Sequence, residues 1–207
     1  AAPQRLAQTR MVQCREAWQA LPAVGAVLEE LNDFANGHAL AECNALAVLF
    51  EETDPAAGEL VKVLIDHVTQ ALHTAPLGQV AMRSSTDGTL SVLMLAQAGN
   101  VSLSLVAIDG EGLAARPSPR TVDFCANEVW EHVLSGTADA ELIECRSHDG
   151  SSADLRRRTI GLHPGKVICR DSERSAMQVL RIEGCLVTLR LQRRRPQADV
   201  TREYDLA

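Results

Sequence analysis

The chain has 207 residues, of which 46% are hydrophobic and 23% charged, a balance that is ordinary for a globular protein. Its formal net charge of −7 argues against a general binder of nucleic acids or anionic membranes, since both need a basic face. No apolar run approaches the ~20 residues that span a bilayer, and no signal peptide is visible, so we expect a cytoplasmic protein.

The first part of the chain, residues 1–76, is predicted to be helical. Apolar side chains recur every three or four positions over residues 6–34, which is typical of an amphipathic helix. Pro22 should divide this stretch, because proline removes a backbone donor and clashes with the preceding turn. Asn36-Gly37 should end it, because both residues tolerate the positive φ of a helix terminus.

Two more helices are expected before the composition changes. One covers about residues 39–52, and Asp54-Pro55 predicts the start of another that reaches about residue 73. Residues 1–76 hold four basic and ten acidic groups, a balance of −6, whereas residues 77–207 hold sixteen and seventeen, a balance of −1. Phosphates would repel so acidic a helical unit, which disfavours a DNA-reading head.

From residue 77 the spacing of apolar residues changes to two, which indicates short β-strands with turns roughly every 8–12 residues. Residues 86–89 and 98–100 carry hairpin signals. Two further turns are expected, one where Gly136 closes "EVWEHVLSG" and one where Glu183-Gly184 interrupts "RIEGCLVTLRLQ".

Two motifs within residues 121–195 give the chain a resemblance to a known family. "EVWEHVLSG" is similar to a glutamate-containing strand that ends in a Val-Leu-x-Gly turn. "GLHPGKVICRDSERSAMQVLRIEGCLVTLRL" is similar to a Pro-Gly turn, an extended segment and a returning strand. Both motifs resemble the cupin superfamily, whose fold is a jelly roll. The expected fold class is α+β, with about three helices in residues 1–76 and an antiparallel cupin-like β-sandwich in residues 77–207. The two regions could form one compact unit.

The resemblance also implies where metal ligands should stand, and this sequence departs from that pattern. A metal-binding cupin has two histidines, one residue apart, shortly before its glutamate. Counting back from Glu128, that place falls in "TVDFC", which offers Asp123 and Cys125 but no histidine. The second motif should supply another histidine, and "CRDSERSAM" has none. We therefore expect no metal and no other cofactor. The alternative is Fe, Ni, Mn or Zn held by a non-standard ligand set.

Four residues are candidates for ligand binding: Trp130, His132, His163 and Glu128. Strand alternation puts Trp130, His132 and Leu134 on one face of their strand. We take this face to be the inner one, which would point His132 into the barrel.

The histidines and glutamates of the β region each have a functional and a structural interpretation. His132, His148 and His163 could hold iron, zinc or manganese if they converge. Two of them stand in predicted polar turns, which favours one half-buried, hydrogen-bonded histidine and two surface ones. Glu128 and Glu131 are three residues apart and should point to opposite faces, so they are not expected to act as an acid–base pair. We expect them to pair with arginines instead.

The arginine runs at 156–158 and 193–195 could bind phosphate or an acidic partner. Alternation along a strand would split each run across two faces, so solvated strand ends with nearby carboxylates are the favoured interpretation.

Three functions remain open. The first is a cupin-like protein without the standard metal site, which binds a small apolar or weakly polar molecule or has a regulatory or assembly role. The second is a metal-dependent cupin enzyme of the dioxygenase or isomerase type, with His132 and His163, or Glu128 and Asp123, as ligands. The third is an interaction module whose helices dimerise or bind a signalling partner. We expect a small-molecule ligand and a homodimer, and neither nucleic acid nor membrane as a partner.

Overall fold

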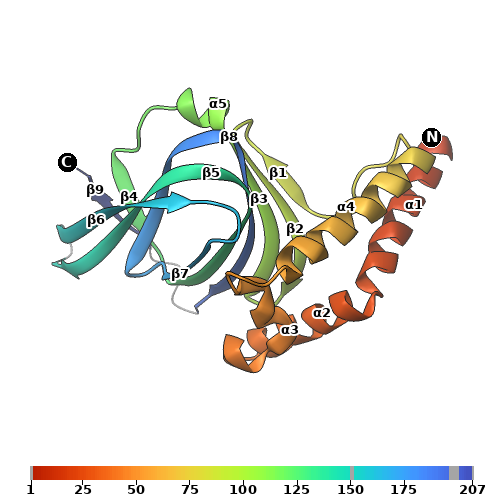
Figure 1. The fold of residues 1–207 in the computed structure, drawn as a ribbon, viewed down its shortest axis with the longest axis horizontal. Helices are drawn as coiled ribbons and strands as arrows, with labels where there is room; N and C mark the ends of the chain where they lie inside the picture. Colours follow the sequence, from red (N-terminus) through yellow and green to blue (C-terminus); the bar gives the residue numbers. More distant parts are fainter. Residues whose placement is uncertain (1, 150–151, 196–200, 207) are drawn as a thin grey trace.

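The computed structural model describes residues 2–149, 152–195 and 201–206. Figure 1 shows the N-terminal helices on one side of a barrel-like region built from strongly bent strands. The strands pair antiparallel, and the helices precede them in the chain. The expected fold class, α+β with a helical segment followed by an antiparallel β region, is confirmed.

The helical segment matches the predicted starts and stops at most places. Its elements are α1 (Ala2–Gln19), α2 (Pro22–Ala35), η1 (Leu40–Glu42), α3 (Asn44–Ala47), η2 (Val48–Phe50) and α4 (Ala56–Thr74). Pro22 opens α2, as its position predicts, and Gly37 follows α2 with a positive φ of 107°. Over the described residues, none of the helices combines the length and the apolar character needed to cross a bilayer.

The helix predicted over residues 39–52 is wrong in one respect, because the segment forms three short turns rather than one helix. Cys43 leaves the helical region, with φ −106° and ψ 78°. The Leu46 N–H donates to the Glu30 carboxylate of α2 at 2.9 Å. A donor that is satisfied from another helix no longer needs a carbonyl in its own segment, so the local ladder breaks there.

The β region forms one large sheet and one small one. Its strands are β1 (Ser84–Thr86), β2 (Leu90–Ala98), β3 (Val101–Asp109), β4 (Thr121–Phe124), β5 (Asn127–His148), β6 (Ala153–Leu162), β7 (Val167–Asp171), β8 (Ser175–Arg194) and β9 (Arg202–Asp205). The large sheet has the order β1-β2-β3-β8-β5-β6, and β7 also pairs with β5. β4 and β9 form the small sheet, and α5 (Gly110–Ala114) lies between β3 and β4.

The two strand breaks predicted at glycines are wrong. β5 continues through Gly136 and β8 continues through Gly184, although both glycines have a positive φ, 86° and 75°. The pairing register between the two strands shifts beside Gly136, and Thr137 pairs with Glu183. The glycines therefore bend two continuous strands at neighbouring points, as bulges do at the corners of curved sheets.

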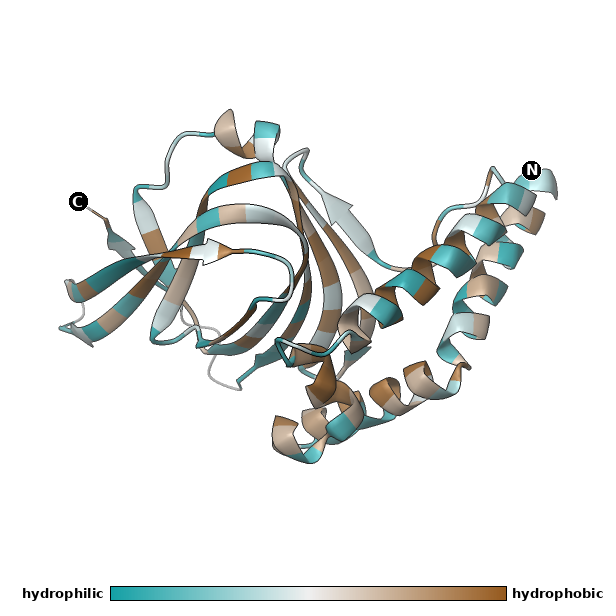
Figure 2. Ribbon diagram, in the orientation of Figure 1, coloured by the Kyte–Doolittle hydropathy of each residue, from teal (hydrophilic) through white to brown (hydrophobic). Residues whose placement is uncertain are grey.

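A shared apolar core joins the helices to the outer face of the sheet. Figure 2 shows apolar residues on the helices and on the strands that they cover. Phe34 and Leu64 of the helices, with Leu103 and Leu189 of the sheet, belong to this cluster. A second cluster, which contains Val133, Ile168 and Leu186, lies inside the barrel, and a third lies under β4 and β9. Both faces of the central strands are thus covered.

Candidate functional site

The face of β5 that carries Trp130 and His132 points to the helices. The Trp130 ring packs edge-on against Phe34 of α2, with ring centroids 5.5 Å apart, and His132 Nδ1 lies 2.7 Å from the carbonyl oxygen of Leu49. The prediction that this face points into the barrel is therefore wrong. Alternation identifies two faces, but here both faces are buried, so the pattern does not tell which one is inside.

Glu128 lies on the same side of β5 as Trp130 and is bound by two arginines. Arg193 Nε lies 2.6 Å and Arg195 Nη2 lies 3.2 Å from its carboxylate oxygens. Burial raises the pKa of Glu128, but the hydrogen bonds and charges of the two arginines outweigh it and hold the pKa below its ordinary value. The expected pairing of this glutamate with arginine is confirmed.

The histidines do not converge. His132 is only 4% exposed, whereas His148 and His163 are exposed. His163 lies in the turn between β6 and β7, where its Nδ1 is 3.1 Å from the Pro164 carbonyl oxygen. The sequence favours one half-buried, hydrogen-bonded histidine and two surface histidines. The structure has this arrangement, with His132 more deeply buried than expected.

The carboxylate inside the barrel is Glu131, which is 1% exposed. Arg170 Nη2 of β7 lies 2.8 Å from Oε2, and Arg190 of β8 donates from Nη2 and Nε to Oε1 at 2.6 and 2.9 Å. Burial raises the pKa of Glu131, but the charges and hydrogen bonds of Arg190 and Arg170 outweigh it, so the pKa lies below its ordinary value. The expected pairing with arginine is confirmed, whereas the interior position was not predicted.

Charge and hydrogen bonding are unbalanced around Glu131. Two guanidinium groups face one carboxylate, and among the described residues no acceptor binds Arg190 Nη1. Thr188 stands two residues before Arg190 on the same face of β8, and its Oγ1 is buried with no hydrogen-bond partner within the described part of the chain. Asn127 Oδ1, on the interior face of β5, is also buried and has no hydrogen-bond partner in the described part of the chain. Buried polar atoms are normally paired, so this region has capacity for a polar ligand or water.

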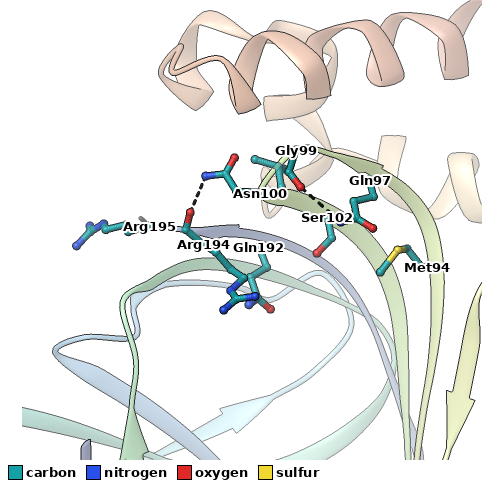
Figure 3. A pocket seen from close by; sticks show the side chains of 9 residues that line it. Met94, Gln97, Gly99, Asn100, Ser102, Gln192, Arg194 and Arg195 are labelled. Carbon is teal, nitrogen blue, oxygen red and sulfur yellow. Dashed lines mark hydrogen bonds between the residues drawn. The ribbon is translucent and has the colours of Figure 1, made fainter. Parts of the chain in front are cut away.

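A pocket of about 620 Å³ lies next to this region, at the end of the barrel where β2 and β3 meet. Figure 3 shows Ser102, Gln192 and Arg194 on the side of the strands away from the helices. Ser102 pairs with Gln192, and Gln192 is two residues from Arg190 on the same face of β8. Further lining residues are Met94, Gln97, Gly99, Asn100, Val101 and Arg195. The pocket therefore carries several hydrogen-bonding side chains, and along β8 it lies next to the interior position of Arg190.

The arginines at 193–194 of β8 and Arg195 after it contact groups on both faces of the sheet. Arg193 and Arg195 bind Glu128, and Arg193 also lies over the Phe34 ring at 4.1 Å from its centroid. Within the described structure Arg194 does not bind Glu128 and lines the interior pocket, which Arg195 also reaches at the end of the strand. The predicted split of this run across two faces is confirmed.

The donor set around the barrel interior does not fit a metal ion. Among the interior residues described above, only Glu131 carries a carboxylate, and guanidinium groups bind both of its oxygens. Across the described ranges, no three side chains of His, Cys, Asp or Glu lie close enough together to hold a metal ion. A cation would also be repelled by Arg170 and Arg190.

Part of the chain is similar in shape to solved structures at low sequence identity. They include the 7S globulin of Momordica charantia, with 12% identity and a TM-score of 0.41 over 61% of this chain and 36% of the globulin. A cupin superfamily protein from Desulfitobacterium hafniense DCB-2 has 17% identity and a TM-score of 0.34, over 54% of this chain and 83% of that protein. A mutant of Bacillus subtilis oxalate decarboxylase has 17% identity and a TM-score of 0.36, over 60% of this chain and 30% of the decarboxylase.

The matched region is thus about a third of the globulin and of the decarboxylase. Similarities at this level carry no information about activity. No family model matches the chain, and no curated protein sequence matches it.

Proposed function

We propose that the chain is a small-molecule-binding protein that works without a metal, and that its barrel takes a ligand with a carboxylate or phosphate group. The observation that carries this proposal is the pairing of two guanidinium groups with one buried carboxylate, Glu131. An anion beside Arg190, whose side chain is 27% exposed, would balance the remaining positive charge, which is costly to leave unpaired where water has limited access.

Two further features support an anionic ligand over the apolar or weakly polar one that the sequence suggested. Six of the nine residues that line the pocket near Glu131 carry an amide, hydroxyl or guanidinium group that can donate to an anion. Thr188 Oγ1 is a buried hydroxyl that can donate to an anion, since no acceptor in the described part of the chain binds it.

A binding role is favoured over catalysis by the state of Glu131. A general base works best when its pKa lies near the operating pH. Arg170 and Arg190 hold the pKa of Glu131 below its ordinary value and occupy both of its oxygens, so the carboxylate is a weak base with no free lone pair aimed at a substrate.

The test is thermal unfolding of the full chain in increasing succinate or inorganic phosphate, with chloride at matched ionic strength as the reference. A ligand that binds only the folded state raises Tm progressively with its concentration. Ser102→Trp, which fills the pocket, should abolish the effect, whereas Ser85→Trp on the exposed strand β1 should keep it. Equal responses of the two variants, or equal responses to chloride and the test anions, would contradict the proposal.

The metal-independent part of the proposal has its own measurement. Elemental analysis of the purified chain should find no stoichiometric metal. One equivalent of tightly held iron, nickel, manganese or zinc would overturn it.

A further inference from the structure

His132 has an acceptor nitrogen that nothing in the described part of the chain uses. A carbonyl oxygen can only accept, so the 2.7 Å contact with Leu49 places a proton on Nδ1, and in the neutral imidazole Nε2 is then an acceptor. The side chain is 96% buried, since 4% of it is exposed, and it lines a cavity of about 370 Å³ between β5 and the start of α4. An acceptor nitrogen on a buried side chain in the wall of a cavity favours a ligand that donates hydrogen bonds.

Carboxylates line the same cavity. Glu52 accepts from Lys166 Nζ at 2.8 Å, and Asp54 Oδ1 accepts the N–H of Ala56 at the start of α4. Glu59, an exposed residue, also lines the cavity, and among the described residues its carboxylate makes no ion pair or hydrogen bond. An unpaired carboxylate beside an acceptor nitrogen suits a donor that carries positive charge.

An apolar cavity of about 290 Å³ adjoins the first one. It lies between α2, the short turns that follow it, and α4, and Val27, Val48, Leu60 and Val63 are among its lining residues. Glu59 is the only charged residue of its lining, and Glu59 lines both cavities. The two spaces therefore meet at one carboxylate, with apolar walls on one side and hydrogen-bond acceptors on the other.

We infer that these joined cavities form a second binding site, for an organic ammonium ion that carries an apolar group. The ammonium group would lie between Glu59 and His132 Nε2, and the apolar group would enter the cavity between α2 and α4. Charge complementarity commits the site to a cation, because the lining of the first cavity holds three carboxylates, those of Glu52, Asp54 and Glu59, against one ammonium group. That ammonium group belongs to Lys62, which pairs with Asp66 outside the cavity lining. The site is separate from the barrel interior and takes the opposite charge, so it stands independently of the proposed function.

The experiment is isothermal titration calorimetry of the full chain with three probes of similar size: 2-phenylethylamine, 2-phenylethanol and 3-phenylpropionate. Saturable binding of the amine is expected, with the alcohol at least about tenfold weaker and no binding of the anion at this site, because only the amine makes charge-assisted hydrogen bonds. No saturable binding of the amine, or equal binding of the amine and the alcohol, would overturn the inference.

Variants locate the site. Glu59→Gln should weaken amine binding by about tenfold, whereas Glu29→Gln, an exposed glutamate of α2, should not change it. Ala26→Phe should block the apolar cavity, which Ala26 lines at a partly exposed position. Ser102→Trp should leave amine binding unchanged. Loss of amine binding in Ser102→Trp, or unchanged binding in both Glu59→Gln and Ala26→Phe, would show that the amine binds elsewhere and would overturn the inference.

Discussion

At the scale of single residues, Glu131 is the group on which the barrel interior depends most. Its carboxylate is 1% exposed and neutralises part of the charge of Arg170 and Arg190. Glu131→Gln would leave two mostly buried guanidinium groups, 14% and 27% exposed, without this counter-ion. Breaking a fully buried pair costs about 3–5 kcal/mol, so we expect a cost of about 2–4 kcal/mol here. Urea unfolding should therefore show a much larger loss for Glu131→Gln than for Glu128→Gln, whose carboxylate is 23% exposed. Similar losses in the two variants would argue against a buried ion cluster.

The same carboxylate predicts how stability depends on pH. The pKa of Glu131 is lowered in the folded chain, so the folded state favours the ionised form. Its contribution to stability is complete above the unfolded pKa of about 4.3 and is lost as the pH falls through the folded value. The difference in unfolding free energy between the natural chain and Glu131→Gln should be constant above about pH 5 and shrink in more acidic buffer. If the difference in unfolding free energy grew as the pH fell, the pKa of Glu131 would not be lowered in the folded chain.

Thr188 offers a test in which stability and binding move in opposite directions. Its Oγ1 is buried without a partner in the described structure, so Thr188→Val should stabilise the free chain by about 1 kcal/mol. If the hydroxyl serves an anionic ligand, the same change should weaken phosphate or succinate binding by about fivefold. Thr159→Val, at an exposed position of β6, should change neither quantity. Thermal unfolding with and without anion measures both effects.

At the scale of elements, the bends at Gly136 and Gly184 differ in what surrounds them. A Cβ at Gly136 would lie 2.2 Å from the Cys185 carbonyl oxygen, whereas a Cβ at Gly184 would meet no atom within 4 Å. Gly184→Ala should therefore cost about 1 kcal/mol, the penalty of a left-handed backbone, and Gly136→Ala about 3 kcal/mol or more, because the strands must also separate. Denaturant unfolding should rank them in that order. Equal costs would mean that the β5–β8 contact yields easily.

The order and type of most elements could be predicted from the sequence. Pro22, Asn36-Gly37 and Asp54-Pro55 mark helix boundaries that the structure has, because their effects are local. Gly136 and Gly184 were misread as turns, because a glycine with positive φ looks the same in a hairpin and in a bent strand. The difference lies in long-range pairing, which single-sequence periodicity does not contain.

The candidate site was harder to predict than the fold. Side-chain alternation along β5 correctly places Glu131 on the opposite face from Trp130 and His132. The expected pairing of Glu128 and Glu131 with arginines is also confirmed. The face of β5 that points into the barrel is determined by where the helices pack. That packing joins residues far apart in the chain, so it is not visible in local sequence patterns. An early signal was available in Glu131 itself, because a glutamate that alternates with Val129 and Val133 shares their buried face.

At the scale of the whole molecule, the helices and the barrel depend on one core. Leu103 and Leu189 of the sheet are 1% and 0% exposed because Phe34 and other helical side chains cover them. A fragment of residues 77–207 should therefore expose a contiguous apolar face and aggregate. Light scattering and solubility of this fragment, compared with the full chain, check the expectation. A soluble monomeric fragment with a cooperative thermal transition would show that the β region folds alone.

The neighbouring positions of Glu131 and His132 have one further consequence. One side chain lies among guanidinium groups and the other beside carboxylates, although a single peptide bond joins them. Inserting or deleting one residue between Asn127 and Glu131 would turn this part of β5 inside out, since side chains alternate strictly along a strand. The glutamate would then meet acidic surroundings and the histidine would meet cations. We expect natural variation in this stretch to change residue types far more readily than residue number.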